Sequence, residues 1–188
     1  FIFPTVYDKS NIVSTLDNNN NGNSVDFENR SSILYKGISS VSNGKFSFEF
    51  ITPKDINYSF GNGRISYYFA NDTIDGKGHN EEIIVGGSSN NSYTDIKGPE
   101  VELYMNDTNF IFGGTTNSTP SLLALIKDES GINTTGTSLG HDITAILDDD
   151  YSNPIILNDF YVSTLDNFKS GSITCLLYTS DAADDSQC

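Results

Sequence analysis

The twelve residues from Asp17 to Glu28 (DNNNNGNSVDFE) form the most specific ligand pattern in the chain. They match the calcium-loop template D-x-[DN]-x-[DN]-G-x5-E at every specified position, and oxygen ligands around a glycine turn suit a hard cation. However, the flanks 10–16 and 31–36 are strand-like, not helical, and a run of asparagines satisfies this template easily. Asparagines also offer little charge to offset dehydration of the ion. We therefore favour a solvated hairpin loop over a calcium site.

Two further groups contain residue types used in catalysis or cation binding. The order Ser138, His141, Asp142 invites a Ser/His/Asp interpretation. Adjacent residues on a strand point to opposite faces, so Asp142 could not orient His141. The three aspartates at 148–150 follow a predicted strand, which is typical of a solvated turn, with calcium binding as the alternative.

Cysteine chemistry depends on the end of the chain, because Cys175 and Cys188 are its two cysteines. A thiolate nucleophile needs a cysteine beside a base, and residues 1–174 contain no cysteine. The two histidines are far apart in sequence, and His79 lies in a predicted exposed polar loop, so a zinc site is not expected. We assign no catalytic, cofactor-binding or metal-binding residues.

The elements that would position any site are predicted to be β-strands. In 45–50 (KFSFEF), 64–69 (RISYYF) and 100–105 (EVELYM), apolar and polar residues alternate with period two, and Val101, Leu103 and Met105 are expected to face inward. This pattern is typical of half-buried antiparallel strands. Further strands are predicted at 32–36, 82–85, 109–112, 121–128, 142–147 and 155–162.

Turn signals separate these segments, among them Asn43-Gly44, Asp75-Gly76 and Ser170-Gly171. Short strands with turns every dozen residues or so predict an all-β fold, an antiparallel β-sandwich of the Ig-like or jelly-roll-like kind. The segment SLLALIKD at 121–128 could also form a short helix, but we interpret it as a strand.

The charge of the chain limits the classes of partner. With 25 acidic and 10 basic residues, the formal net charge is −15, and phosphate binding needs a basic footprint that is absent, so nucleic acid is not an expected partner. An acidic surface rich in Asn, Ser, Thr and Gly is typical of secreted or cell-surface proteins. No apolar run approaches the ~18 residues of a transmembrane helix.

A series of motifs in a fixed order resembles a known family. They are GKFSF at 44–48, TPKDINY at 52–58, GNGRISYY at 61–68, GPEVELYMND at 98–107, DESGIN at 128–133, GHDI at 140–143 and LNDFY at 157–161. Together they resemble the β-sandwich region of PorU-type proteins, the gingipain-like sortases of the Bacteroidetes type IX secretion system. The resemblance runs from about Pro4 to Thr174.

The resemblance implies a parent protein that removes carboxy-terminal sorting domains from secreted cargo at the outer membrane. In that family a caspase-like cysteine peptidase domain with a catalytic Cys and His precedes this region, and neither residue can be carried over to residues 1–174. The chain is then expected to be a non-catalytic, exported fragment. Its partners would be the missing caspase-like domain, outer-membrane components of the secretion system and cargo sorting domains.

The resemblance also divides the chain into an N-terminal segment at 1–30, a β-sandwich domain at 31–174 and a tail at 175–188. The tail departs from the family, and residues 175–185 (CLLYTSDAADD) resemble a translated sequencing adapter. The alternative is a disordered acidic tail with one disulfide. Without the tail, which holds three aspartates and no base, the formal charge of −15 becomes −12.

Two other functions remain open from the residues alone. Ten tyrosines and many polar loops would also suit a cell-surface adhesin or glycan-binding β-sandwich. The loop from Asp17 to Glu28 would suit a calcium-stabilised module, whose melting temperature would fall on addition of EDTA.

Overall fold

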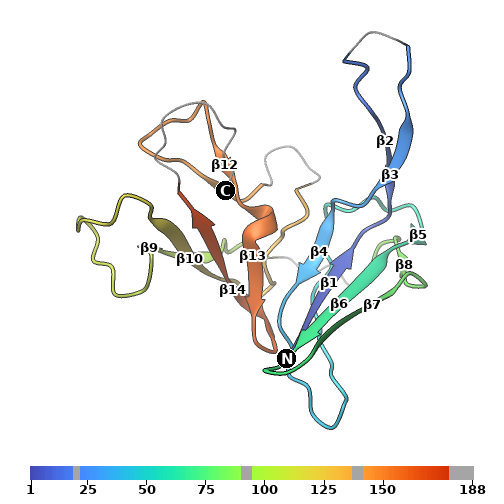
Figure 1. Ribbon diagram of the computed structural model, residues 1–188, viewed down its shortest axis with the longest axis horizontal. Helices are drawn as coiled ribbons and strands as arrows, with labels where there is room; N and C mark the ends of the chain where they lie inside the picture. Colours follow the sequence, from blue (N-terminus) through green and yellow to red (C-terminus); the bar gives the residue numbers. More distant parts are fainter. Residues whose placement is uncertain (19–21, 90–94, 137–141, 178–188) are drawn as a thin grey trace.

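A computed structural model describes residues 1–18, 22–89, 95–136 and 142–177. The prediction of an all-β antiparallel fold is confirmed. Two four-stranded antiparallel sheets form a sandwich-like arrangement, and within the described residues the only helical element is a single 3-10 turn, η1 (Asn158–Phe160). Figure 1 shows the two sheets side by side, with the β-strands of each fanning away from the point where the sheets meet. None of the helices within these ranges is long and apolar enough to cross a bilayer.

The first sheet has the strand order β4 (Ile33–Lys36), β1 (Ile2–Tyr7), β6 (Arg64–Ala70) and β7 (Asp75–Asn80). Each neighbouring pair is antiparallel. Along β1 buried and half-buried residues alternate, as expected for a central strand with one face on the core. The sheet therefore draws on both sides of the boundary predicted at residue 30.

The second sheet has the strand order β13 (Tyr161–Thr164), β14 (Asn167–Leu176), β10 (Ser121–Lys127) and β9 (Glu100–Met105). Buried and half-buried residues alternate along β10 too, and Leu122, Ala124 and Ile126 face the core. The pairing of β10 with β14 is continuous from Ser121↔Leu176 to Lys127↔Ser170. The interpretation of 121–128 as a strand is confirmed.

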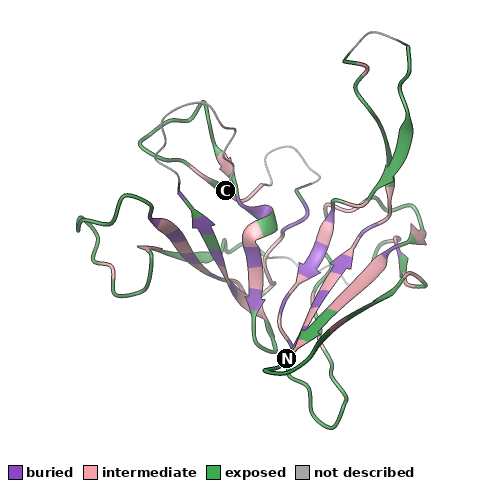
Figure 2. Ribbon diagram, viewed as in Figure 1, coloured by how far each residue is buried: buried purple, intermediate pink, exposed green. Residues whose placement is uncertain are grey.

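Three two-stranded ladders complete the chain. They are β2 (Asn11–Ser14) with β3 (Asp26–Asn29), β5 (Gly61–Asn62) with β8 (Ile84–Val85), and β11 (Thr144–Ala145) with β12 (Ile155–Ile156). The β2–β3 hairpin projects away from both sheets, and its strand residues are exposed on both faces (Figures 1 and 2).

Each sheet has a hydrophobic core of its own. The core of the first sheet is built around Val6, Leu34, Tyr35 and Val85. The core of the second consists of Leu122, Ala124, Ile126, Leu157, Tyr161, Ile173, Cys175 and Leu177. Figure 2 shows these buried positions along the central strands of each sheet.

The sheets are joined by contacts between the chain at 36–40 and the chain at 159–166. Ile38 forms an isolated parallel bridge with Leu165, and the Asp166 N–H donates to the Ile38 carbonyl at 2.9 Å. The Asp166 carboxylate accepts the Ser40 N–H at 2.9 Å, and the Lys36 ammonium donates to the Asp159 carbonyl at 2.7 Å. The hydrogen bonds between the sheets thus come mainly from the chain just after β4 and the β13–β14 turn.

Two predicted strands are wrong. Residues 45–50 form no ladder beyond the Ser42↔Lys45 bridge. The Phe48 and Phe50 rings stack on the Tyr35 ring instead, at centroid distances of 5.4 and 5.1 Å. Residues 109–112 form tight turns, with the Phe110 N–H donating to the Asp107 carbonyl at 3.2 Å.

Other strand predictions are confirmed in place but differ in length. The segments 32–36, 64–69 and 100–105 correspond closely to β4, β6 and β9. The segments 82–85 and 142–147 shorten to two-residue strands, and 155–162 divides into β12, η1 and the start of β13.

Strands β1, β3, β5, β7 and β14 were not predicted, whereas β2 lies in the flank 10–16 that was described as strand-like. Two of the unpredicted strands, β7 and β14, contain glycines that the sequence reading took as turn signals. Gly76 lies beneath the Phe69 ring and Gly171 beneath the Tyr161 ring, so each aromatic side chain packs over the bare backbone of a neighbouring strand. Glycine is needed there because a Cβ would meet the ring.

Candidate interaction surface

The described residues of the calcium-like pattern belong to the β2–β3 hairpin, so the hairpin prediction is confirmed. The pattern is not all loop, because its last three residues, Asp26 to Glu28, are in β3 and pair with β2. The Asp17 carboxylate accepts the Gly22 N–H at 2.5 Å, and the Ser14 hydroxyl donates to Asp26 at 2.5 Å. Residues 19–21 lie outside the described ranges. Within those ranges no three His, Cys, Asp or Glu side chains are grouped so that they could hold a metal ion.

The residues considered for catalysis are placed only in part. Ser138 and His141 lie outside the described residues, while Asp142 is half-buried. His79 is exposed, as predicted, but sits on β7 opposite Ser66, not in a loop.

The aspartates at 148–150 form a solvated turn, as predicted, with positive φ at Asp148 and Asp149. Hydrogen bonds from the Asn153 amide and the Ser152 N–H lower the pKa of Asp150. The carboxylate is thus satisfied by its own turn.

The last described residues belong to the second sheet. Cys175 is fully buried in β14 opposite Leu122, and its sulfur is in a disulfide. Leu177 is buried, and its N–H donates to the Pro120 carbonyl at 2.8 Å. Residues 178–188, which include Cys188, lie outside the described ranges, so the adapter interpretation of the tail stays a prediction.

An apolar groove is the main hollow of the second sheet. Its volume is about 580 Å³, and it is bounded by the face of β9, β10 and β14, by the chain at 143–147 and 155–157, and by the loop that carries Phe110 and Phe112. On β9, Val101 and Leu103 are 52% and 63% exposed. The prediction that they face inward is therefore right about the side of the sheet but wrong about burial. They share the face of the buried β10 residues, but nothing in the described ranges covers them.

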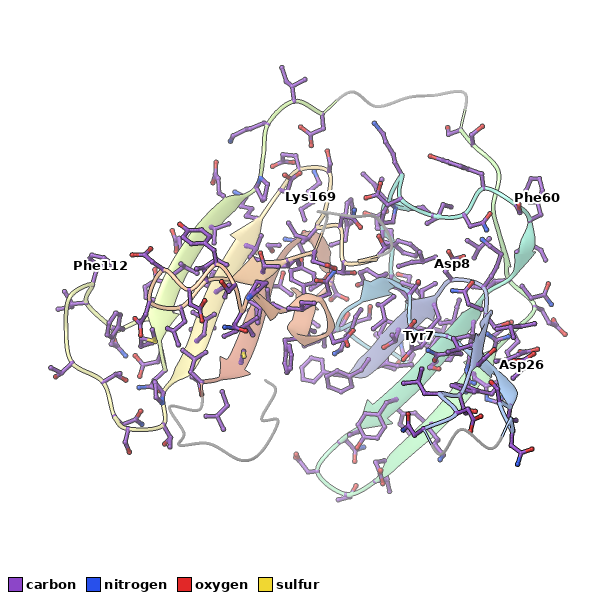
Figure 3. The ribbon with its side chains drawn as sticks, turned by 90° about the horizontal axis from the view of Figure 1, so that it is seen from above. Tyr7, Asp8, Asp26, Phe60, Phe112 and Lys169 are labelled. Carbon is purple, nitrogen blue, oxygen red and sulfur yellow. The ribbon has the colours of Figure 1, made fainter. Side chains whose placement is uncertain are left out.

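A second hollow lies beside the first sheet. Its volume is about 950 Å³, and its floor includes Val6, Leu34 and Ile65. Two exposed aromatic side chains, Tyr58 and Phe60, stand at its rim, and the Tyr58 hydroxyl donates to the Lys54 carbonyl at 2.7 Å. Figure 3 shows Phe60 and Phe112 at opposite ends of the molecule, so the two hollows are separate surfaces.

A smaller polar hollow of about 400 Å³ lies where the sheets meet, between the chain at 40–49 and Asp166. The Ser40 N–H holds the pKa of Asp166 below its usual range. Nearby, burial raises the pKa of Tyr161 to about 12. In this hollow Ser40 and Asp166 already bond to each other across the junction of the sheets, so we do not assign the hollow as a binding site.

The residues that line these surfaces could be predicted only in part. Alternation in 100–105 identifies the apolar face of β9, but the groove also needs residues more than forty positions away. The exposed aromatics at 58 and 60 lie in the irregular segment between Phe50 and β5, for which no element was predicted.

No family model matches the chain, and no curated protein is significantly similar to it. Among solved structures, the chain is similar to dimeric latent PorU from Porphyromonas gingivalis, with 30% sequence identity and a TM-score of 0.47. The match covers 96% of this chain and 17% of that chain, so the chain spans a small part of the length of that protein.

Proposed function

We propose that this chain is a non-catalytic β-sandwich region of a PorU-type sortase, a protein that processes secreted cargo of the type IX secretion system at the outer membrane. The observation that carries the proposal is the ordered series of sequence motifs from GKFSF at 44–48 to LNDFY at 157–161. Seven motifs in matching order are far more specific than any one of them.

The positions of these motifs agree with a structural role. GNGRISYY covers β5 and most of β6, GPEVELYMND covers β9 and both of its ends, and LNDFY covers η1 and the first residue of β13. These segments contribute to both four-stranded sheets and to the β5–β8 ladder, and they contain no cysteine that could serve as a nucleophile. The shared residues thus describe a scaffold.

In the proposed protein the chain packs against a caspase-like domain and contacts secretion components or cargo sorting domains at the cell surface. The acidic composition suits such an exported protein. The exposed apolar side chains of β9 supply a surface that could be buried in such contacts.

The proposal is tested by assaying the purified chain on a sorting-domain substrate, with a full-length PorU-type enzyme as the positive control. Circular dichroism should show a folded β protein, and cleavage should stay at the level of buffer alone. The DNA flanking the coding sequence should encode a caspase-like region with a Cys and a His upstream. Cleavage by the chain alone, or an upstream region without that domain, would overturn the proposal.

A second candidate function, glycan binding, is favoured by the hollow beside the first sheet. Tyr58 and Phe60 are 53% and 76% exposed at its rim, and aromatic faces are common platforms for sugar rings. A glycan array would identify a ligand, and Phe60→Ala should then weaken binding at least tenfold. Phe112→Ala is the matched control, because Phe112 is 99% exposed at the other end of the molecule.

A further inference from the structure

Strand β9 is the outer strand of the second sheet, with β10 on one side, and none of the residues 1–18, 22–89, 95–136 and 142–177 pairs with its other edge. In Figures 1 and 3 it lies at the side of the sheet away from β13 and β14. Exposed edges in natural proteins are usually blunted by charged side chains, a proline, a bulge or a short strand, and β9 carries two charged side chains, Glu100 and Glu102, on the face away from the groove. Strand β9 has six residues without proline, and its register with β10 is unbroken from Met105 to Glu100.

The backbone register shows which residues of β9 direct their polar groups to the open edge. The Asn106 N–H donates to the Ser121 carbonyl at 2.7 Å, so these opposite residues occupy a hydrogen-bonded position. Such positions alternate along an antiparallel pair. Val101, Leu103 and Met105 therefore direct their N–H and C=O groups away from β10.

The hydrogen bonds between β10 and β14 confirm this alternation of hydrogen-bonded positions. The Leu177 N–H donates to the Pro120 carbonyl, and the Asp128 N–H donates to the Lys169 carbonyl, each at 2.8 Å. Even-numbered residues of β10 thus bond to β14, which leaves odd-numbered residues to bond to β9.

The side chains of the same three β9 residues line the apolar groove. Val101, Leu103 and Met105 lie opposite Ile126, Ala124 and Leu122, the residues of β10 that face the core. An antiparallel strand added at the open edge would place the side chains of its own hydrogen-bonded residues on this face. Backbone pairing and apolar burial would therefore be satisfied by a single strand.

The opposite face of β9 is acidic. Glu100 and Glu102 are exposed there, and the neighbouring hollow is lined by Asp95, Asp128 and Glu129 together with Lys97 and Lys127. Lys97 pairs with Glu100 and Lys169 pairs with Glu129, each at 2.7 Å, so these five carboxylates still outnumber the three lysines. The whole chain also carries a net charge of −15, which attracts a cationic partner and repels a second copy.

We propose that the open edge of β9 binds an extended antiparallel strand of a partner polypeptide in which aliphatic residues alternate with Lys or Arg. The aliphatic side chains enter the apolar groove beside Val101 and Leu103. The basic side chains lie on the other face beside Glu100 and Glu102. This is β-strand addition, in which main-chain hydrogen bonds give affinity and alternate side chains give specificity. The proposal does not depend on the proposed function.

Peptide titration against the complete chain tests the proposal without altering the protein. The probe is a capped peptide of about ten residues in which Val and Lys alternate, and the control is its Val and Glu counterpart. We expect the Lys peptide to bind at least tenfold more tightly than the Glu peptide, with affinity falling as salt rises. N-methylation of the Val residues should abolish binding, whereas N-methylation of the Lys residues should leave it unchanged.

Protein variants locate the bound peptide. Val101→Pro removes an N–H that β10 does not use, and Leu103→Asp puts a charge in the groove. Each should weaken binding of the Lys peptide at least tenfold. Ile74→Asp is the matched control, because Ile74 is 62% exposed in the β6–β7 turn, and it should bind normally. Glu102→Lys should reverse the preference between the two peptides. Circular dichroism verifies that each variant is folded.

Several results would overturn the proposal. The first is that neither peptide binds at about 1 mM, and the second is that both bind with equal affinity. The third is that N-methylation of the Lys residues abolishes binding while N-methylation of the Val residues does not. The last test measures the oligomeric state of the chain by analytical ultracentrifugation. A dimer of the chain that Val101→Pro dissociates would identify a second copy as the occupant of the edge and would also contradict the proposal.

Discussion

The two sheets of this molecule are similar in size but differ in how they are covered. In the first, Phe48 and Phe50 fold back from an irregular segment and stack on Tyr35, at interplanar angles of 2° and 14°. In the second, the core is mainly aliphatic and is complete only over β14 and β10. Strand β9 continues the apolar face of that sheet, yet Leu103 is 63% exposed.

The difference shows that alternation along a strand determines which face is apolar, whereas burial depends on what lies above it. Long irregular segments of the chain cover the first sheet. Among the described residues, the second is covered by the segments 143–147 and 155–157, by the loop beyond β9 and by Ile132 and Phe160. The four predictions below test this contrast, from the largest expected effect to the smallest.

The largest effect is expected at the centre of the second sheet. Ile173 is fully buried in β14, so Ile173→Ala should lower the free energy of unfolding by about 2 to 5 kcal/mol through lost burial and a cavity. Leu103→Ala, in the same sheet, should lower it by less than about 1 kcal/mol, because the side chain is already in water. Urea denaturation measures both. Equal losses would show that β9 is covered in solution and would remove the contrast.

The sequence predicted the all-β class and the strands with strong alternation, because these patterns are local. It could not predict β7, whose residues DGKGHN include no apolar side chain, because that strand forms only by pairing with β6. It also assigned 45–50 to a strand. There the three phenylalanines serve aromatic packing, a tertiary effect that period-two alternation does not distinguish from a ladder.

The groove was beyond sequence reasoning for a similar reason. Alternation in 100–105 identified Val101 and Leu103 as apolar-face residues, which the register confirms. Whether that face is buried depends on residues at 143–147 and 155–157. No local sequence pattern shows that these residues lie close to β9. The open edge likewise follows from strand order, a property of the whole sheet.

The next effect concerns a glycine beneath an aromatic ring. A Cβ at Gly171 would lie within 3 Å of the Tyr161 ring, so Gly171→Ala should lower the free energy of unfolding by about 1 to 3 kcal/mol. Gly78 on the edge strand β7 has no atom near the position of a Cβ. Gly78→Ala should therefore leave stability unchanged or slightly raise it. If both variants melt alike in urea, the ring does not pack on Gly171.

A smaller effect appears only in alkali. Burial raises the pKa of Tyr161 to about 12, above the value near 10 expected in the unfolded chain. The stabilisation from the neutral buried phenol is therefore complete below pH 10 and is lost progressively between pH 10 and 12, about 1 kcal/mol at pH 11. Tyr161→Phe should reduce this loss, as measured by urea midpoints at pH 8 and pH 11. Tyr151→Phe, at a position 76% exposed, is the control and should behave as wild type.

The smallest effect is expected at the junction between the sheets. Asp166 has a positive φ of 53°, and its carboxylate accepts the Ser40 N–H, which lowers its pKa. Because the pKa is lowered in the folded state, the stabilisation is present above the ordinary aspartate value near 3.8 and is lost as pH falls below it. Asp166→Asn keeps an acceptor and tolerates the backbone, so it should differ slightly from wild type at pH 7 and still less at pH 3. Asp166→Ala loses the acceptor and strains the turn, so it should lower the urea midpoint further at both pH values. An Asn variant whose deficit is the same at pH 7 and pH 3 would show that the carboxylate charge does not help to join the sheets.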